Sequence, residues 1–446
     1  MWLLALLFFV VLFIIAATSL LRLHPFLVLL TAAFLYGFAS GRLGGSEIVE
    51  AIKQGFGGTV GAVGLVILCG TVIGTFLQKS GGAGILAAWT LRLLGPGRVI
   101  PALLLVGALV SIPVFCDSGF VVLCPLAFAM ARGAGIGRGQ AAIALSLGLY
   151  ATHTMVPPTP GPVAAAGLLG ADLAQVVLIG GAVSLPALLA GWAFAALAAK
   201  GIGGDEQASQ AAGDPLQPQP GAPSAVQALL PIAVPLCLIL LGSLTTIPSR
   251  PFGDSAPAEI IAFLGKPLVA LSAGMLLAFG LARSAGIEVL GSGGWVGQAV
   301  KASAAIIVVT GCGGAFGRVI QASGIGQAVE SSVSTLKAGV WLPFLLAAAL
   351  KTAQGSSTVA MTATAAVVEP LLGSLGLASP VGRAVAVVAA GAGSMVVSHA
   401  NDSYFWVVTQ FSNLSVREGY RLQTLGTLVQ GVVAACGLWI VARILL

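Results

Sequence analysis

Apolar runs long enough to cross a lipid bilayer recur along this whole chain. A bilayer core of about 30 Å needs roughly 20 apolar residues in an α-helix, which satisfies its own backbone hydrogen bonds. The runs cover residues 2–21, 25–41, 58–77, 174–199, 226–246 and 263–282, and another begins at 302. With only 8% charged residues, a soluble domain of 446 residues could not cover its surface. The sequence therefore predicts an all-α polytopic membrane protein.

The charged residues and the cysteines argue against several classes of function. The net charge of +6 comes from basic residues scattered through short loops, without a basic run, so we expect no nucleic-acid partner. The six cysteines lie in apolar segments and form no CxxC pair, which indicates buried side chains rather than metal ligands or disulfides. We expect no metal and no cofactor.

Four apolar segments are interrupted by polar residues. These breaks are Cys116–Gly119, Thr152–Pro162, Lys351–Thr358 and Ser398–Tyr404. The prolines of the second break remove amide donors and fix φ, so no continuous helix can pass through it. Unpaired backbone at membrane depth is tolerated only where protein or water satisfies it. The breaks therefore predict a buried polar cavity.

The breaks fall into two similar halves of the chain. Three pairs of segments match in the same order: Cys69–Gly74 with Cys312–Gly317, Cys116–Gly119 with Gln354–Ser357, and Thr152–Thr154 with Ser398–Ala400. Repeats with broken helices at equivalent places are typical of secondary transporters, which bind substrate at the breaks. Hydropathy leaves open whether the two repeats are inverted.

A polar segment separates the halves. Residues 201–225 are rich in proline and glycine and contain no Lys or Arg, a composition typical of a linker. We therefore divide the chain into a first repeat half (1–200), the linker (201–225) and a second repeat half (226–446).

Two of the breaks have the chemistry of a helix N-terminus. In Gln354–Thr358 and in Asp117–Gly119, small polar residues precede an apolar helical run. Free amides, hydroxyl groups and the helix dipole together favour an anion. Two such termini meeting near the midplane would bind a carboxylate that carries hydroxyl groups. Ordinary helix caps are the alternative interpretation.

The ionisable residues at the breaks suggest how transport could be coupled. Asp117 and Asp402 are the candidate proton-coupling residues, because protonation would remove their repulsion of an anionic substrate. Alternatively, Asp117 forms a structural ion pair with Lys351 or Arg318. Arg318 is also a second-rank carboxylate ligand, because guanidinium binds carboxylates bidentately. The expected substrate-binding residues are Ser118, Gly119, Thr152, His153, Thr154, Gln354, Gly355, Ser356, Ser357, Thr358, His399, Asn401 and Ser403. His153 and His399 could instead be buried hydrogen-bonding residues.

Four long motifs resemble those of the gluconate permease (gluconate:proton symporter) family. They are Pro113–Phe120, Ala151–Pro162, Leu350–Met361 and His399–Trp406, and the resemblance covers essentially the whole chain. It implies a multi-pass bacterial inner-membrane symporter for gluconate or a related hydroxy- or amino-acid, such as idonate, fructuronate, D-glycerate or D-serine. The wider ion-transporter superfamily implies inverted repeats, paired re-entrant hairpins, a scaffold, an elevator-type transport domain and a homodimer. On that template, residues 116–119 and 354–358 are hairpin tips, and 152–162 and 398–403 are unwound helices.

Proton-coupled symport of a small carboxylate is thus the expected function, and membrane lipid is the expected surrounding. One alternative is sodium coupling, with Asn401 and Ser403 as ion ligands. Another is an intramembrane enzyme using Asp117 and His153, but the chain has no nucleophile–base pairing and no metal spacing such as HExxH. A channel is disfavoured because the asymmetric breaks indicate a closed site rather than a ring-lined pore. We expect a transporter and no enzyme activity.

Overall fold

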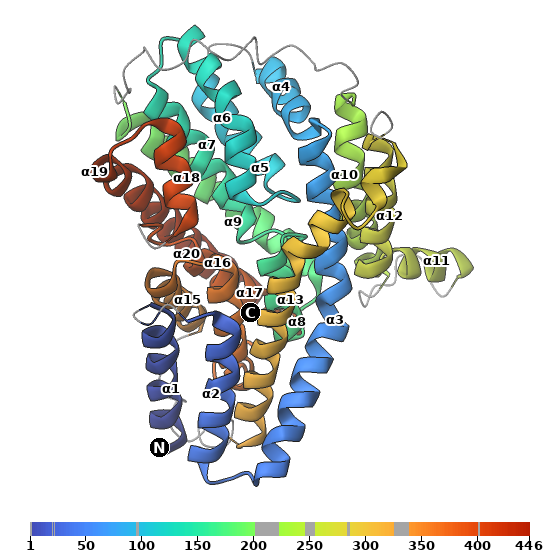
Figure 1. Cartoon of the computed structure of the whole chain (residues 1–446), viewed down its shortest axis with the longest axis vertical. Coiled ribbons are helices and arrows are strands. Elements are labelled where there is room, and N and C mark those ends of the chain that lie inside the picture. The colour runs from blue at the N-terminus through green and yellow to red at the C-terminus, as the bar shows by residue number, and fades with distance from the viewer. Residues whose placement is uncertain are drawn as a thin grey trace.

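The computed structural model describes residues 2–19, 21, 23–94, 98–200, 223–245, 255–282, 286–324, 339–399 and 402–446, and every regular element in these ranges is a helix (Figure 1). The first half contains α1 (Trp2–Ser19), α2 (Pro25–Ser40), α3 (Gly45–Lys79), α4 (Gly82–Leu94), α5 (Val99–Val110), α6 (Cys116–Gly133), α7 (Arg138–His153), α8 (Pro160–Leu169) and α9 (Leu173–Leu197). The second half contains α10 (Ala225–Leu244), α11 (Ala256–Leu264), α12 (Pro267–Phe279), η3 (Gly280–Ala282), η4 (Ile287–Leu290), α13 (Trp295–Ala322), α15 (Trp341–Gln354), α16 (Ser357–Val368), η5 (Glu369–Leu371), α17 (Pro380–Ser394), α18 (Ser403–Ser412), α19 (Val416–Gly419), η6 (Tyr420–Thr424) and α20 (Leu425–Leu445).

Several of these helices are long and apolar enough to cross a membrane. Within the described ranges there are four such helices, or up to six when each bent pair of helices counts as one span. The outer helices expose large apolar side chains, among them Phe9 on α1, Leu189 on α9 and Leu276 on α12. Exposed apolar surface of this extent suits lipid rather than water. The predicted all-α polytopic membrane class is confirmed. Residues 201–222 of the predicted linker lie outside the described residues.

The same order of elements occurs in each half. A helical hairpin (α5–α6 or α15–α16) is followed by a helix that ends early (α7 or α17), a short helix (α8 or α18) and a long helix (α9 or α20). The hairpins contact the opposite halves, because α6 packs against α18 and α16 packs against α8. The four polar breaks are thereby drawn toward one region of the molecule.

The two broken helices are interrupted by different means. In the first half, the Thr159 hydroxyl donates to the carbonyl oxygens of His153 (2.8 Å) and Val156 (2.9 Å) after α7 has ended at the proline-rich segment. In the second half the chain turns at Val397, whose φ is 56°, and Asp402 caps α18 by accepting from the Tyr404 amide at 3.1 Å. Backbone groups freed by the breaks thus find partners inside the protein.

Helix α13 is packed closely between α3 and α16. A Cβ atom added to Gly314 would lie 2.6 Å from the carbonyl oxygen of Gly55 on α3, and one added to Gly313 would lie 2.7 Å from Cγ2 of Thr362 on α16. Small residues allow helices in a membrane to approach to backbone contact. Glycine is therefore required at these two places by the distance between neighbouring helices.

Replacing Gly314 by alanine is expected to destabilise the protein by about 1–3 kcal/mol, because the added methyl group cannot fit without moving α3. Unfolding by SDS in mixed micelles measures this loss. Gly61→Ala on α3 is the matched control, since no atom lies within 4 Å of a Cβ added there. Equal stability of the Gly314→Ala variant and the unchanged protein would contradict the packing argument.

Candidate functional site

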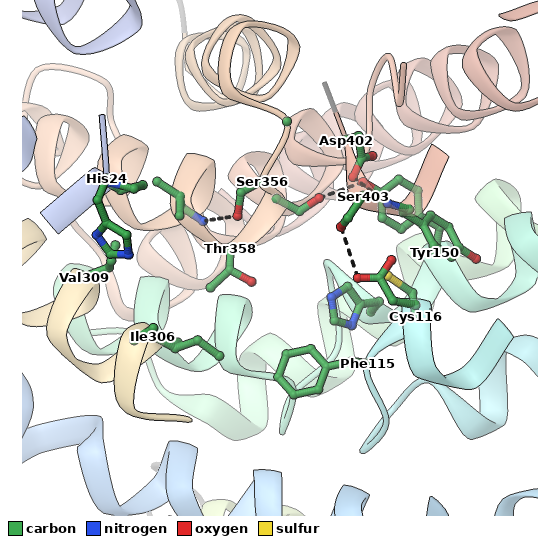
Figure 2. Close-up of a pocket in the computed structure, with 18 residues that line it drawn as sticks. His24, Phe115, Cys116, Tyr150, Ile306, Val309, Ser356, Thr358, Asp402 and Ser403 are labelled. Atoms are coloured by element: carbon green, nitrogen blue, oxygen red, sulfur yellow. Dashed lines mark hydrogen bonds between the residues drawn. The ribbon is translucent and has the colours of Figure 1, made fainter. Parts of the chain in front are cut away.

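A cavity of about 510 Å³ lies where the two hairpins and the two broken helices meet (Figure 2). We call it the central cavity. Its wall is contributed by the hairpin tips, by α7, by the start of α18, and by α2 and α13. The lining residues are His24, Pro25, Phe115, Cys116, Asp117, Tyr150, His153, Ala305, Ile306, Val309, Gly355, Ser356, Ser357, Thr358, Val359, Asp402, Ser403 and Tyr404.

The start of α16 supplies a row of hydroxyl groups to the cavity. The hairpin turns at Gly355 (φ 82°), and the Ser356 side chain caps the helix by accepting from the Val359 amide at 3.4 Å. The Ser357 hydroxyl donates to a carbonyl oxygen on α17 at 2.9 Å, so the Tyr150 hydroxyl, 2.7 Å away, donates to Ser357. The helix dipole of α16 thus points its positive end at the cavity. This wall suits an anion that carries hydroxyl groups.

Asp117, in the first turn of α6, faces the same space. Its Oδ2 atom accepts from the Ser403 hydroxyl at 3.3 Å, and Figure 2 draws this contact as a dashed line from Ser403. Its Oδ1 atom is buried and has no hydrogen-bond partner in the described part of the chain. A carboxylate withdrawn from water with an unused oxygen is costly, and in a membrane it marks a site for a proton, ion or ligand.

Asp402 has a different environment from Asp117. Its Oδ2 atom accepts from Lys351 Nζ at 2.6 Å and from the Ser398 hydroxyl at 2.6 Å, while Oδ1 caps α18. Lys351 also donates to the Gly355 carbonyl oxygen, and both charged side chains are buried. The ion pair therefore ties the tip of the α15–α16 hairpin to the break before α18. The alternative pairing of Asp117 with Lys351 or Arg318 is wrong, because Lys351 bonds Asp402 and Arg318 lines a different cavity.

His153 ends α7 beside the cavity. Its side chain is 6% exposed, and its Nδ1 atom has no partner among the residues that the structure describes. The ring centroid lies 6.0 Å from that of Phe115 at the tip of the α5–α6 hairpin. The imidazole can therefore exchange a hydrogen bond with a bound molecule.

The structure brings eight of the expected site residues to the cavity and leaves others away from it. The lining set is Asp117, His153, Gly355, Ser356, Ser357, Thr358, Asp402 and Ser403. Ser118, Gly119, Thr152, Thr154 and His399 are not among the lining residues. Asn401 and the side chain of Gln354 lie outside the described residues.

Four of the five residues away from the cavity have packing or backbone partners. Thr152 donates to the Ala108 carbonyl oxygen at 2.7 Å, and Thr154 lies 3.5 Å from the Tyr150 carbonyl oxygen. His399 Nε2 lies 2.8 Å from the Thr352 carbonyl oxygen and its ring stacks on Tyr420. Another residue here, Gly119, faces Leu149, 2.7 Å from where its Cβ would be. These contacts place Thr152, Thr154, His399 and Gly119 in the framework of the site.

Sequence reasoning missed several lining residues. Tyr150 had a usable signal, since it carries a hydroxyl in an apolar helix two residues before the break. His24 was not among the expected site residues, yet as the cap of α2 its ring faces the cavity (Figure 2). The apolar wall formed by Ala305, Ile306 and Val309 had no signal, because such residues are equally common on lipid-facing helices.

The described residues contain no cluster of three His, Cys, Asp or Glu suited to a metal ion. The polar residues that line the central cavity offer hydrogen bonds and charge. One wall, from α6, α16 and α18, is polar, and the wall from α13 is apolar. This arrangement suits a small acid with one carboxylate and a polar edge.

Known proteins are similar to this chain over nearly its whole length. The model of the family described as GntP family permease matches residues 1–444. A protein named gluconate permease from Pseudomonas aeruginosa is 34% identical over 92% of this chain and 91% of its own length. The inner membrane permease YgbN of Escherichia coli is 32% identical over 94% of each chain, and the D-serine transporter DsdX of the same species is 29% identical over 95% of this chain and 94% of its own.

Two solved structures share the fold. The YdaH transporter of Alcanivorax borkumensis superposes with a TM-score of 0.68 at 18% identity, covering 94% of this chain and 99% of that one. MtrF of Neisseria gonorrhoeae, described as an antimetabolite efflux pump, gives a TM-score of 0.70 at 14% identity and covers 96% of each chain. At these identities the likeness concerns the fold alone.

Proposed function

Because this chain belongs to the GntP permease family, we propose that it carries gluconate, or a related small hydroxy- or amino-acid anion, across the bacterial inner membrane together with a proton. Its relatives are permeases and transporters, so the chain is a multi-pass inner-membrane transporter of small anions rather than a member of an enzyme family. Proton coupling and the identity of the acid are the parts that we propose.

The observation that carries the proposal is the pairing of an anion-binding helix start with an unpaired acid. The hydroxyl groups of Ser356, Ser357 and Thr358 line the cavity at the start of α16, where the helix dipole favours a carboxylate. Asp117 stands on the same cavity with one oxygen unpartnered among the described residues. In our proposal the carboxylate of the anion lies at the start of α16. The polar groups at the other end of the anion contact Asp117, which is protonated and therefore neutral.

Asp117 is the proton-coupling residue that we favour over Asp402. The anion and a deprotonated Asp117 would repel each other in a medium of low dielectric constant, so binding of one proton permits binding of one anion. Asp402 already has a full positive charge beside it, since Lys351 Nζ lies 2.6 Å from its carboxylate. The charge of Asp402 is therefore already balanced within the protein, whereas that of Asp117 faces the cavity without a cation bonded to it.

We propose further that the two halves are inverted repeats that move as an elevator in a homodimer. The matched order of hairpin, broken helix and long helix supports the repeat. In this proposal the chain divides at residues 201–225, between α9 and α10. The polar hairpins and broken helices would form the moving part, and the apolar face of α13 would belong to the scaffold.

Uptake of labelled acids into proteoliposomes tests the proposed function. We expect gluconate uptake to rise several-fold when the outside is acidified and to be unaffected by a sodium gradient, because Asp117 takes up a proton with each anion. Glycerate and D-serine complete the substrate panel, and protein-free liposomes and a protonophore are the controls. Uptake driven by sodium, or indifferent to both gradients, would contradict proton symport.

A further inference from the structure

A second hollow, of about 200 Å³, lies further along the helices that line the central cavity. We call it the Arg318 cleft. Its walls come from the first part of α3, the last part of α13, the end of α8 and the end of α16. The lining residues are Gln54, Gly55, Gly58, Thr59, Leu168, Gly314, Gly317, Arg318, Gln321, Ala366 and Glu369.

The Arg318 cleft and the central cavity share one helix interface. Helix α16 begins at the central cavity and ends at the cleft, where Glu369 follows it. Along α13, Arg318 is roughly 13 Å beyond Val309 at about 1.5 Å per residue. Between the two hollows, α13 and α16 are in contact, with Gly313 packed on Thr362. The cleft therefore lies at one end of the interface between α13 and α16, the interface along which we expect the central cavity to open.

The charges around the cleft favour an anion. Arg318 is exposed, and its Nη1 atom donates to Gln321 Oε1, while Gln321 Nε2 donates to Glu369 Oε1 at 3.5 Å. Arg318 and Glu369 are the two charged residues that line the cleft, and Gln321 bridges them. No carboxylate forms a salt bridge with Arg318 in the described ranges. Its remaining N–H groups are available to a bidentate ligand.

The cleft also has room and further hydrogen-bonding groups. Gly58 has no atom within 4 Å of the position that a Cβ would take, so this side of α3 is open. The Thr59 hydroxyl and the Gln54 amide line the same space, and Gln54 Nε2 also donates to Glu50 Oε1 at 3.1 Å. These groups could bind the hydroxyl or amino groups of an acid whose carboxylate is held by Arg318.

We propose that the Arg318 cleft is a second carboxylate-binding site, at one mouth of the transport pathway. A small organic anion binds to Arg318 on one side of the membrane before it enters, or after it leaves, the central cavity. The site rests on the proposed transport of such anions and gives Arg318 a role that differs from that of Asp117. It makes the affinity for substrate on one membrane face depend on a residue that the central cavity does not contain.

Gluconate uptake into right-side-out and inside-out membrane vesicles tests this site with the variants Arg318→Gln and Arg318→Lys. We expect Arg318→Gln to raise KM about tenfold on the face where the cleft opens, the loss that follows removal of one charge-assisted hydrogen bond, and to change the maximal rate less than twofold. Arg318→Lys keeps the charge and should raise KM less. Lys301→Gln, an exposed cation on the same helix outside the cleft, is the control and should change neither value.

A second variant separates binding from folding. No atom lies within 4 Å of a Cβ added at Gly58, so Gly58→Leu places an apolar side chain on the open side of the cleft and should raise KM on the same face as Arg318→Gln. Unchanged KM in both variants on both faces would overturn the second site, and so would an equal rise on both faces, which would indicate an effect on the central cavity. If the unchanged protein takes up neither gluconate, glycerate nor D-serine, the proposed function fails instead.

Discussion

Replacing Asp117 by asparagine is expected to abolish accumulation of substrate driven by a pH gradient while exchange of substrate across the membrane continues. The amide is nearly the same size as the carboxylate and can still accept from Ser403, so the cavity keeps its shape. It cannot bind and release the coupling proton. We expect gradient-driven gluconate uptake to fall at least tenfold, with counterflow exchange reduced only a few-fold.

The pH dependence of binding should change in the same variant. With aspartate at residue 117, affinity for the anion should weaken as pH rises, because the deprotonated carboxylate repels the substrate. With asparagine, affinity should be independent of pH over the same range. Binding of gluconate to the detergent-solubilised protein, measured by calorimetry at several pH values, tests this difference.

Two variants control for a non-specific loss of uptake driven by the pH gradient. Asp117→Glu retains a titratable group and should keep gradient-driven uptake, although at a lower rate. Asp172→Asn removes an exposed acid that caps α9, remote from the lining of the central cavity, and should leave coupling intact. Accumulation by the Asp117→Asn variant in response to a pH gradient would show that another group carries the proton.

The buried Lys351–Asp402 pair is expected to give the largest stability effects. Replacing Lys351 by glutamine leaves the Asp402 carboxylate buried without its cation, and such a loss destabilises by about 3–5 kcal/mol. Asp402→Asn leaves the ammonium group uncompensated and should have a similar effect. The double variant contains two neutral groups that can still hydrogen-bond, so it should recover a large part of the loss.

A double-mutant cycle of unfolding free energies in mixed micelles measures this coupling. The exposed Lys53–Glu50 pair, at 3.4 Å, provides the comparison, because an exposed pair contributes about 0–1 kcal/mol. The folded double variant should also retain pH-driven uptake, since in our proposal Asp117 carries the proton. Additive losses would contradict a direct pair, and loss of coupling in the folded double variant would restore Asp402 as a candidate.

Much of the architecture could be predicted from the sequence because bilayer physics restricts it strongly. Apolar runs of sufficient length must be helices, and a proline-rich or polar interruption must end them. The interruption expected at Thr152–Pro162 agrees with the end of α7, and Gln354 and Ser357 bound the turn of the α15–α16 hairpin. Helix α17 already ends at Ser394, before the interruption expected at Ser398–Tyr404. The expected interruption at Cys116–Gly119 is wrong in its position, because these residues form the first turn of α6 and the hairpin turns before them. The motifs also resembled the correct family, which the comparisons confirm.

The partners of the charged groups were decided only by the tertiary structure. Asp117 and Asp402 both occupy polar interruptions in apolar surroundings. The sequence alone therefore does not decide which of them forms an ion pair with Lys351. The packing of the hairpin tip against the α17–α18 break selects Asp402, and Asp117 is left facing the cavity beside Ser403. The same packing turns Thr152 and Thr154 toward backbone carbonyl oxygens, although they are the direct neighbours in sequence of the lining residue His153.

The sequence by itself thus determined the class of protein, the places where its helices stop, and the chemistry gathered at those places. These are local properties, set by hydrophobicity, backbone geometry and the side chains of neighbouring residues. Which wall of the cavity is apolar, which acid is compensated and where Arg318 opens a second hollow depend on contacts between helices far apart in the chain. Such contacts arise only when the helices pack together, and they decide which of the polar residues are free to meet a substrate.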